Sequence, residues 1–281
     1  MEYRRQVPAI QQIRTFMLRS LREMFRSKIA LFWAIAWPIF WYGLTMAVFI
    51  GDLPQDVMAI VKATNAINFG MFGALTVGLV TFAENISSDL EEKRYRKLRS
   101  LPISPWADLT GRIFAGFAMA IVSFLALMVV GYLHGAAFQL RSLGSIPIVV
   151  LALFLYCVIG MAIAVIVVSV VNRGEYVTAI TTTLLLILFF VTGYNGVQPG
   201  FVPADTRSIV NVLPNSLATR MEVYHLTELG QLDDIADSGL VPPELPGGPE
   251  HLLLLAGFAV ALWGLSVAVM KYRIYDGEAG E

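Results

Sequence analysis

Six long runs without lysine, arginine, aspartate or glutamate constrain this chain more than any other feature. They cover residues 29–51, 63–83, 113–140, 142–172, 176–204 and 251–270. A helix needs about 20 apolar residues to cross the hydrocarbon core of a bilayer, and a charge at its centre costs roughly 2.5–3.5 kcal/mol. Strands with open edges are excluded because backbone groups in lipid must be paired. The runs therefore predict an all-α membrane protein with six transmembrane helices.

Composition agrees with one membrane domain that spans residues 1–281. Only 15% of the residues are charged, against about 25% in soluble domains. A net charge of −1 gives no reason to expect a nucleic-acid partner, and the single cysteine cannot form an internal disulfide. We expect the transmembrane helices at 29–51, 63–83, 110–134, 146–171, 177–195 and 252–270.

The positions of lysine and arginine predict the orientation. With six spans the two termini share a side, and that side holds sixteen of these residues against four on the other. Cytoplasmic loops carry the excess of positive charge. We therefore expect a multi-pass protein of the plasma (inner) membrane with both termini in the cytoplasm.

The N-terminal segment, residues 1–28, has an amphipathic pattern. Apolar residues recur at helical spacing between arginines, namely Ile10, Ile13, Met17, Leu21, Met24 and Phe25. The pattern favours a helix that lies in the headgroup layer of the membrane. A solvated helix that packs on a partner is the alternative.

The densest block of charge follows the second apolar run, at residues 88–105. Ser88 and Glu91 have the spacing of a capping box, and Pro102 disfavours helix just before it. Ser104 and Pro105 then have the pattern of a new helix start. The block predicts a short, rigid cytoplasmic helix over 88–101, with a solvated loop as the alternative.

Two apolar spans carry residues that could contact a substrate. Trp33, Trp37 and Trp41 share one face of the first span, where they could form an aromatic surface for a sugar or an amphiphile, or anchor and pack the helix. Pro38 is expected to kink this helix. In the fifth span Thr181 and its neighbouring threonines could line a path or bond their own helix.

The fifth run is interrupted at Gly193–Gly196, before three prolines and several polar residues. Broken backbone at membrane depth is tolerated only against protein or water. We expect one or two short re-entrant helices at about 197–222, within an extracytoplasmic segment over 196–250.

Several kinds of chemistry are absent from the sequence. No phosphate-binding loop of the G-x-x-x-x-G-K-[ST] type occurs, and the three histidines are scattered without metal-ligand spacing. None of the expected spans has a charged residue at its centre, whereas ion-coupled transporters and intramembrane enzymes usually do. We therefore expect no catalytic residues, no metal site and no cofactor bound by this chain.

The stretch LEEKRYRKLRSLPISPWADLTGR has an acidic pair, a leucine and a proline before a new helix, at Glu91, Glu92, Leu98, Leu101, Pro102 and Gly111. In these residues it resembles the loop after the second span in the permeases of type 2 (also called type V) ATP-binding-cassette exporters. Arg112 replaces the usual lysine there, and Tyr95-Arg96 replaces a small Gly-Thr pair. In TGYNGVQPGFVPADTRSIVNVLPNSLATR, Pro203, Pro214 and Arg220 follow the order of the family's re-entrant segment. The order of the elements along nearly the whole chain is also similar.

The resemblance implies a permease that binds two separate ATPase subunits, which hold the ATP and Mg²⁺. Its copies would pair as a homodimer or with a homologous permease, surrounded by membrane lipid. Helix 88–101 would be the coupling helix, with ATPase contacts at Glu91, Glu92, Arg94, Leu98 and Arg99. The path would lie between the copies, with Trp37, Trp41, Thr181 and Asn195 as candidate lining residues.

The resemblance implies the substrate class less directly than it implies the partners. Family members export glycans, drugs and other amphiphiles, and the apolar fifth span favours an amphiphilic, drug-like or lipid-like substrate. A glycan or lipid-linked polysaccharide is the alternative within the family. A stand-alone ion-coupled transporter or channel, and a membrane enzyme, are the alternatives from other classes.

Overall fold

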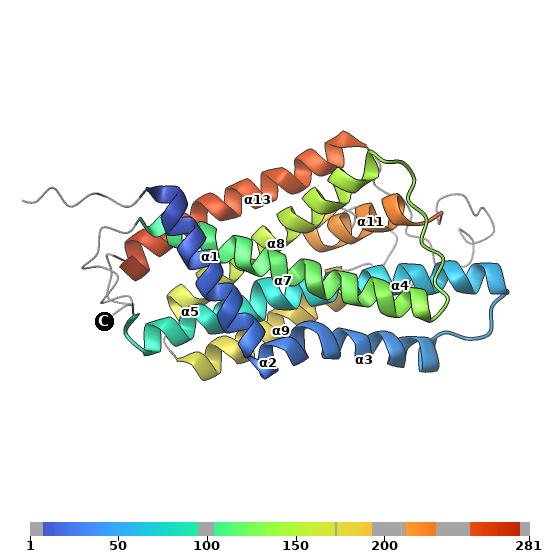
Figure 1. Cartoon of the computed structure of the whole chain (residues 1–281), viewed down its shortest axis with the longest axis horizontal. Coiled ribbons are helices and arrows are strands. Elements are labelled where there is room, and N and C mark those ends of the chain that lie inside the picture. Colours follow the sequence, from blue (N-terminus) through green and yellow to red (C-terminus); the bar gives the residue numbers. More distant parts are fainter. Residues whose placement is uncertain are drawn as a thin grey trace, which may run out of the picture.

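The computed structural model of the chain describes residues 8–94, 104–171, 173–192, 209, 212–228 and 248–275. Its long helices lie side by side along one axis in an elongated bundle (Figure 1). The described residues form helices and connections without a strand. Six helical segments are long and apolar enough to cross a membrane: Lys28–Phe49, Gln55–Glu91, Trp106–Leu133, Ser145–Val170, Gly174–Val191 and Pro249–Ile274. The predicted all-α fold with six spans is therefore confirmed.

Helix α1 (Ala9–Arg26) lies obliquely across one end of the bundle, in dark blue in Figure 1. Its buried residues are Phe16, Ser20 and Met24, while Ile10 and Phe25 are exposed. The short α2 (Lys28–Leu31) follows, with the Ser27 side chain accepting a hydrogen bond from the Ala30 amide. The expected amphipathic helix thus exists, and its place in the headgroup layer stays a prediction.

The first span continues through η1 (Phe32–Ala36), α3 (Trp37–Leu44) and η2 (Thr45–Phe49), of which η1 and η2 are π-helical. Pro38 has no amide hydrogen to donate to the carbonyl of Ala34, four residues earlier. The Ser123 hydroxyl, from the third span, donates to that carbonyl. An added Cβ at Gly73 would lie 2.9 Å from the same oxygen, so the second span must be narrow here.

The second span is the central helix of the bundle, built from α4 (Gln55–Leu75), π-helical η3 (Thr76–Thr81) and α5 (Phe82–Glu91). It is longer than the expected 63–83 at both ends. Its apolar stretch is buried throughout, and Gly78 packs against Cys157 and Gly160 of the fourth span. Small residues allow this close helix contact.

The predicted start of a new helix at Ser88 is wrong. Residues 88–91 are the last turn of α5, the chain turns at Glu92, and Lys93 adopts the left-handed conformation (φ 55°) that often ends helices. The Ser88 and Glu91 spacing therefore occurs inside a helix rather than at its N-terminus. The rest of the expected coupling helix, residues 95–101, lies outside the described residues.

Helix α7 (Pro105–Leu133) begins at the predicted place, with Ser104 before it. The Ser104 side chain makes no cap, and its amide donates instead to Gln12 Oε1 of α1 (3.1 Å). Helices α8 (Ser145–Val170) and α9 (Gly174–Thr192) form the fourth and fifth spans. We call the end of the bundle that holds Arg19, Asp89 and Gly174 the base, and the other end the His134 end.

The remaining helices are α11 (Pro214–Leu226), α13 (Pro249–Val269) and the π-helical η6 (Met270–Tyr275), which extends α13. Helix α11 is short and lies among the longer helices toward the His134 end, in orange in Figure 1. It overlaps the expected re-entrant region 197–222. Most of the residues before and after it are outside the described residues, so a re-entrant course stays a prediction.

Candidate functional site

The base of the bundle is held together by a close crossing of α1 over α7. Gly111 makes this crossing possible, because an added Cβ there would lie 2.6 Å from Ile13 O and 2.7 Å from Phe16 Cβ. The crossing brings the polar side of α1 against the end of α5. The two helices are far apart in the chain, so only the fold can combine their charges.

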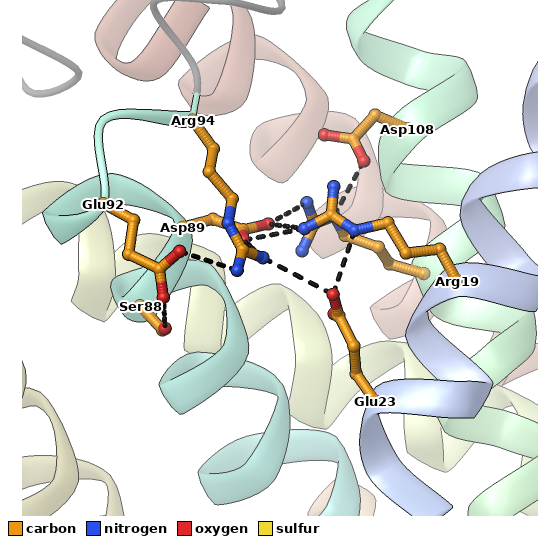
Figure 2. Close-up of polar contacts among 8 residues, drawn as sticks. Arg19, Glu23, Ser88, Asp89, Glu92, Arg94 and Asp108 are labelled. Atoms are coloured by element: carbon orange, nitrogen blue, oxygen red, sulfur yellow. Dashed lines mark hydrogen bonds and ion pairs between the residues drawn. The ribbon is translucent and has the colours of Figure 1, made fainter. Parts of the chain in front are cut away.

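Asp89 lies at the centre of the charges that meet at the base, as Figure 2 shows. Its side chain is 2% exposed and accepts hydrogen bonds from three arginines. Arg19 Nη2 of α1 donates to both carboxylate oxygens (2.9 and 3.2 Å). Arg94 Nη1 donates to Oδ1 (2.6 Å) and Arg112 Nη2 of α7 to Oδ2 (2.5 Å). One carboxylate thus joins α1, the end of α5 and α7.

Three further carboxylates complete this set of charges. Glu23 Oε1 accepts from Arg19 Nε (3.0 Å) and Arg94 Nη1 (3.4 Å). Asp108 Oδ1 accepts from Arg112 Nε (2.7 Å), and Glu92 Oε2 pairs with Arg94 Nη2 (2.6 Å). We call Arg19, Glu23, Asp89, Glu92, Arg94, Asp108 and Arg112 the Asp89 cluster.

Solvent exposure differs across the cluster, which has a buried core and a solvated rim. The side chains of Asp89, Asp108 and Arg112 are at most 4% exposed, whereas those of Arg19, Glu23, Arg94 and Glu92 are 31–53% exposed. Buried charges are tolerated when they are paired and hydrogen-bonded, and a pair that loses one partner costs about 3–5 kcal/mol. The core therefore tightly fixes the position of α5 against α7.

Arg94 is the last residue described before the chain enters residues 95–103. Burial alone would lower the pKa of its guanidinium, but the charge and hydrogen bond of Asp89, together with Glu92, raise this pKa above its ordinary value. Arg94 therefore remains a cation at any physiological pH. The residue at which the chain leaves α5 is consequently held to Asp89 by an ion pair whose cation stays charged.

The structure places three of the five predicted ATPase-contact residues. Glu91 lies at the end of α5, and its Oε1 accepts from the Gly174 amide at the start of α9 (2.7 Å). Glu92 and Arg94 belong to the Asp89 cluster. Leu98 and Arg99 are outside the described residues. Glu91, Glu92 and Arg94 thus lie together at the base. The Glu91 carboxylate is already hydrogen-bonded within the chain, to the Gly174 amide.

Three of the four candidate path residues are also placed. Trp37 and Trp41 are half-buried and pack edge-to-face (5.7 Å between ring centroids), and Trp41 also contacts Phe190 of α9 (6.1 Å). Thr181 is fully buried, and its hydroxyl donates to Val177 O of its own helix (2.8 Å). Asn195 is outside the described residues. Trp41 therefore lies where the first and fifth spans meet, with Trp37 beside it on the first span, while Thr181 faces the interior of the chain.

Sequence reasoning missed the centre of the site. The sequence pattern gives Asp89 no role beyond the charged block, and it does not place Arg19, Asp108 or Arg112 in a common site. Within the described residues, no group of three or more histidine, cysteine, aspartate or glutamate side chains could hold a metal ion. The ion pairs of Asp89 join α1, α5 and α7 at the base.

Comparison with known proteins places this geometry in a family. Residues 11–202 match the family model of the ABC-2 type transporter. The matched range includes α1, the Asp89 cluster and the first five spans. No curated protein sequence matches the chain significantly. Because the match covers more than half of the chain, the protein belongs to the ABC-2 type transporter family, whose domain is a membrane component of ATP-binding-cassette transporters.

Proposed function

We propose that this chain is the permease subunit of an ATP-driven exporter, powered by separate ATPase subunits that hold the ATP and Mg²⁺. The observation that carries the proposal is the Asp89 cluster, which joins three helices where the chain leaves α5. Residues 95–103 connect that point directly to α7. A partner that pulls on this segment would pull on the second and third spans together.

Such an arrangement suits the transmission of force. Coupling between distant sites needs a rigid element with two discrete arrangements. The buried pair of Asp89 and Arg112 supplies rigidity, because separating the two charges without water is costly. Closure of the ATPase subunits would therefore tilt the second and third spans as one unit, and the excess of lysine and arginine at the base supports a cytoplasmic position for it.

A second permease copy, either identical or homologous, would cover the poorly buried faces of the first and fifth spans. Exposed aromatic and aliphatic side chains extend along both spans, among them Phe32, Phe40, Ile187, Phe190 and Val191. Trp41 and Phe190 join the two faces. The substrate path would lie between the copies along this combined surface.

The same surface supports an amphiphilic, drug-like or lipid-like substrate that leaves the cytoplasm or the inner leaflet. Trp37 stacks on Phe40 (5.6 Å between ring centroids, 17° between planes). The side chains exposed along this face offer aromatic and aliphatic contact, whereas a glycan would require an array of hydrogen-bonding groups to recognise its hydroxyls. An apolar ligand with one polar end fits this surface best.

The proposal is tested by recovery of the partner from native membranes. The tagged chain is purified in mild detergent as wild type and as the double variant Leu98→Asp/Arg99→Glu, which leaves every described contact intact. We expect a P-loop ATPase with wild type and its loss with the double variant. Glu250→Arg, at the His134 end, is the matched charge-reversal control and should retain the ATPase. Recovery of wild type without any ATPase, from membranes of cells that make both proteins, would contradict the proposal.

A further inference from the structure

Helix α11 carries a glutamate that the proposed function does not use. Glu222 is 0% exposed, and neither of its carboxylate oxygens has a hydrogen-bond partner within the part of the chain that the structure describes. Buried carboxylates are normally paired or hydrogen-bonded, because an isolated buried charge is very costly. An unpaired buried glutamate therefore calls for a physical explanation.

Two hydrogen bonds locate α11 against the fourth span. His225 Nδ1, near its end, lies 2.9 Å from Ser145 Oγ, the first residue of α8. Near the start of α11, Tyr156 Oη donates to Asn215 Oδ1 (2.5 Å). Ser145 and Tyr156 are roughly 16 Å apart along α8 at 1.5 Å per residue. Helix α11 thus runs antiparallel to α8 and reaches deep into the bundle from the His134 end.

Glu222 belongs to the polar stripe of α11. Asn215, Thr219 and Glu222 recur at i, i+4 and i+7 and therefore share one face of the helix. Asn215 also donates to Leu188 O of α9 (2.8 Å), so this face points into the bundle. The Thr219 hydroxyl is buried without a partner among the described residues. The Cys157 thiol of α8 is close enough to Glu222 to sense its charge.

No cation on the surrounding elements neutralises Glu222 in an ion pair within the described residues. The charged and titratable groups on the elements packed against α11 are Tyr156 and Cys157 on α8, Asp56 and Lys62 on α4, Glu175 and Tyr176 on α9, and Glu250 and His251 on α13.

The basic side chains on and around α11 have other partners or point away from Glu222. Lys62 donates to His134 O (2.9 Å) at the end of the bundle. On α11 itself, Arg220 precedes Glu222 by two residues, and residues at i and i+2 do not face each other. The neighbouring loop cation, Arg141, stacks on the Tyr224 ring (3.8 Å). His225, three residues on, contacts Ser145.

A carboxyl in such surroundings keeps its proton. Desolvation disfavours the ionised form and so raises the pKa of a buried acid. Helix α11 lies outside the six spans, and burial raises the pKa of the Glu222 carboxyl well above its usual range. If α11 moved away from α8, water would reach the carboxyl, and the proton would pass to that water.

We propose that Glu222 is a proton-binding site that holds α11 against α8: the carboxyl is neutral while the helix is seated and releases its proton when the helix moves out. Because proton release accompanies the movement, alkaline conditions favour the unseated helix. Helix α11 is then a pH-sensitive element at the His134 end. This inference concerns the chain itself and stands or falls independently of the ATPase partner and the substrate.

The protonation state is measured by infrared spectroscopy of the full-length chain in lipid nanodiscs. We expect a C=O stretch of a protonated carboxylic acid at neutral pH in wild type, and its loss in Glu222→Gln. Glu250→Gln removes an exposed carboxylate at the same end and should leave the band in place. If Glu222→Gln instead removes a carboxylate band and no protonated band, Glu222 is ionised and the proposal is wrong.

The link to movement is measured through the only cysteine in the chain. Cys157 is fully buried beside α11, so a membrane-permeant maleimide should label it only when α11 is unseated. We expect equal labelling of wild type and Glu222→Gln at low pH. Above the pKa of Glu222 the rate ratio should rise by up to about tenfold per pH unit, because one proton is released. Equal rates at every pH would refute the link.

Two controls keep the labelling result interpretable. An ionised Glu222 that stayed beside the thiol would slow its reaction, so faster labelling requires movement rather than a local charge effect. Glu222→Met has similar length and no titratable group, and it should behave as Glu222→Gln does. Cys157→Ser should abolish labelling. Both Glu222 variants should elute as wild type does in size-exclusion chromatography.

Discussion

Asp89 of α5 and Arg112 of α7 form an ion pair of 2.5 Å in which both side chains are at least 96% excluded from solvent. Each member has a second set of partners, since Asp89 also binds Arg19 and Arg94, and Arg112 also binds Asp108. The pair is therefore the buried centre of a larger set of charges. It fixes the ends of the second and third spans to each other and to α1.

Replacement of Asp89 by asparagine should destabilise the protein strongly. The variant leaves Arg19, Arg94 and Arg112 without their shared carboxylate, and breaking a buried pair costs about 3–5 kcal/mol. Thermal unfolding of the purified chain, followed by tryptophan fluorescence, should show a clear loss of stability. Glu92→Gln removes an ion pair whose carboxylate is 53% exposed and should change the midpoint little, because exposed pairs contribute at most about 1 kcal/mol. Equal effects of the two variants would contradict the central role of Asp89.

Gly111→Ala should loosen the crossing of α1 over α7. The new methyl group would lie 2.6 Å from Ile13 O, which is backbone and cannot rotate away, and overpacking of this kind typically costs about 1–3 kcal/mol. We expect a lower unfolding midpoint and faster proteolysis of the N-terminal segment. Gly257→Ala is the matched control, since an added Cβ there meets nothing within 4 Å. A normal midpoint for Gly111→Ala would show that the crossing is looser than described.

Ser123→Ala should weaken the contact between the first and third spans. The hydroxyl donates to Ala34 O, and side-chain hydrogen bonds between membrane helices contribute about 0.6 kcal/mol on average and up to about 1.7. In a Pro38→Ala background the cost should shrink, because the new backbone amide at position 38 can donate to that carbonyl. A double-mutant cycle of unfolding free energies measures this coupling. If the changes in unfolding free energy were additive, Ser123 and Pro38 would not be coupled.

Acidification should loosen the His134 end. His134 Nδ1 lies 3.0 Å from the Tyr42 hydroxyl, and its carbonyl accepts from Lys62. Although His134 is an exposed residue, partial desolvation and then the charge of Lys62 lower its pKa below the ordinary value of 6.5. The unfolded state therefore binds the proton more readily, so this contribution is complete above about pH 6.5 and is lost as the pH falls through the lowered pKa.

The measurement is the unfolding midpoint between pH 7.5 and 5 for wild type and His134→Gln. Wild type should lose more stability than the variant over this interval, because glutamine does not titrate. His251→Gln, whose imidazole lies beside Glu250 (3.3 Å), is the control histidine. Parallel curves for wild type and His134→Gln would contradict the assigned role of His134.

The six spans could be predicted from sequence because the cost of a charge in lipid leaves a local and unambiguous mark. The start of α7 could also be predicted, since Pro105 follows Ser104 at the point where the helix begins. The end of α5 could not be predicted. Ser88 and Glu91 are three residues apart both in a capping box and inside any helix, and the pattern alone cannot distinguish them.

The Asp89 cluster could not be found by spacing, because its members lie far apart in the chain. Arg19 is 70 residues and Arg112 is 23 residues from Asp89. The crossing permitted by Gly111 brings Arg19 of α1 to the site, and the ion pair between α5 and α7 adds Arg112. Glu222 did leave a signal: it lies at i+7 from Asn215 in a helix that begins at Pro214. This position lies outside the long apolar runs, so the cost of a charge in lipid does not single it out.

Contact between the segment after Arg94 and a partner ATPase can be detected by photo-crosslinking in native membranes. A benzophenone amino acid is placed at position 98 or, as a control, at the exposed position 253 in α13. We expect a crosslinked product that contains a P-loop ATPase from position 98 and none from position 253. Crosslinking at position 98 to lipid or to the chain itself alone, in membranes that contain the ATPase, would contradict it.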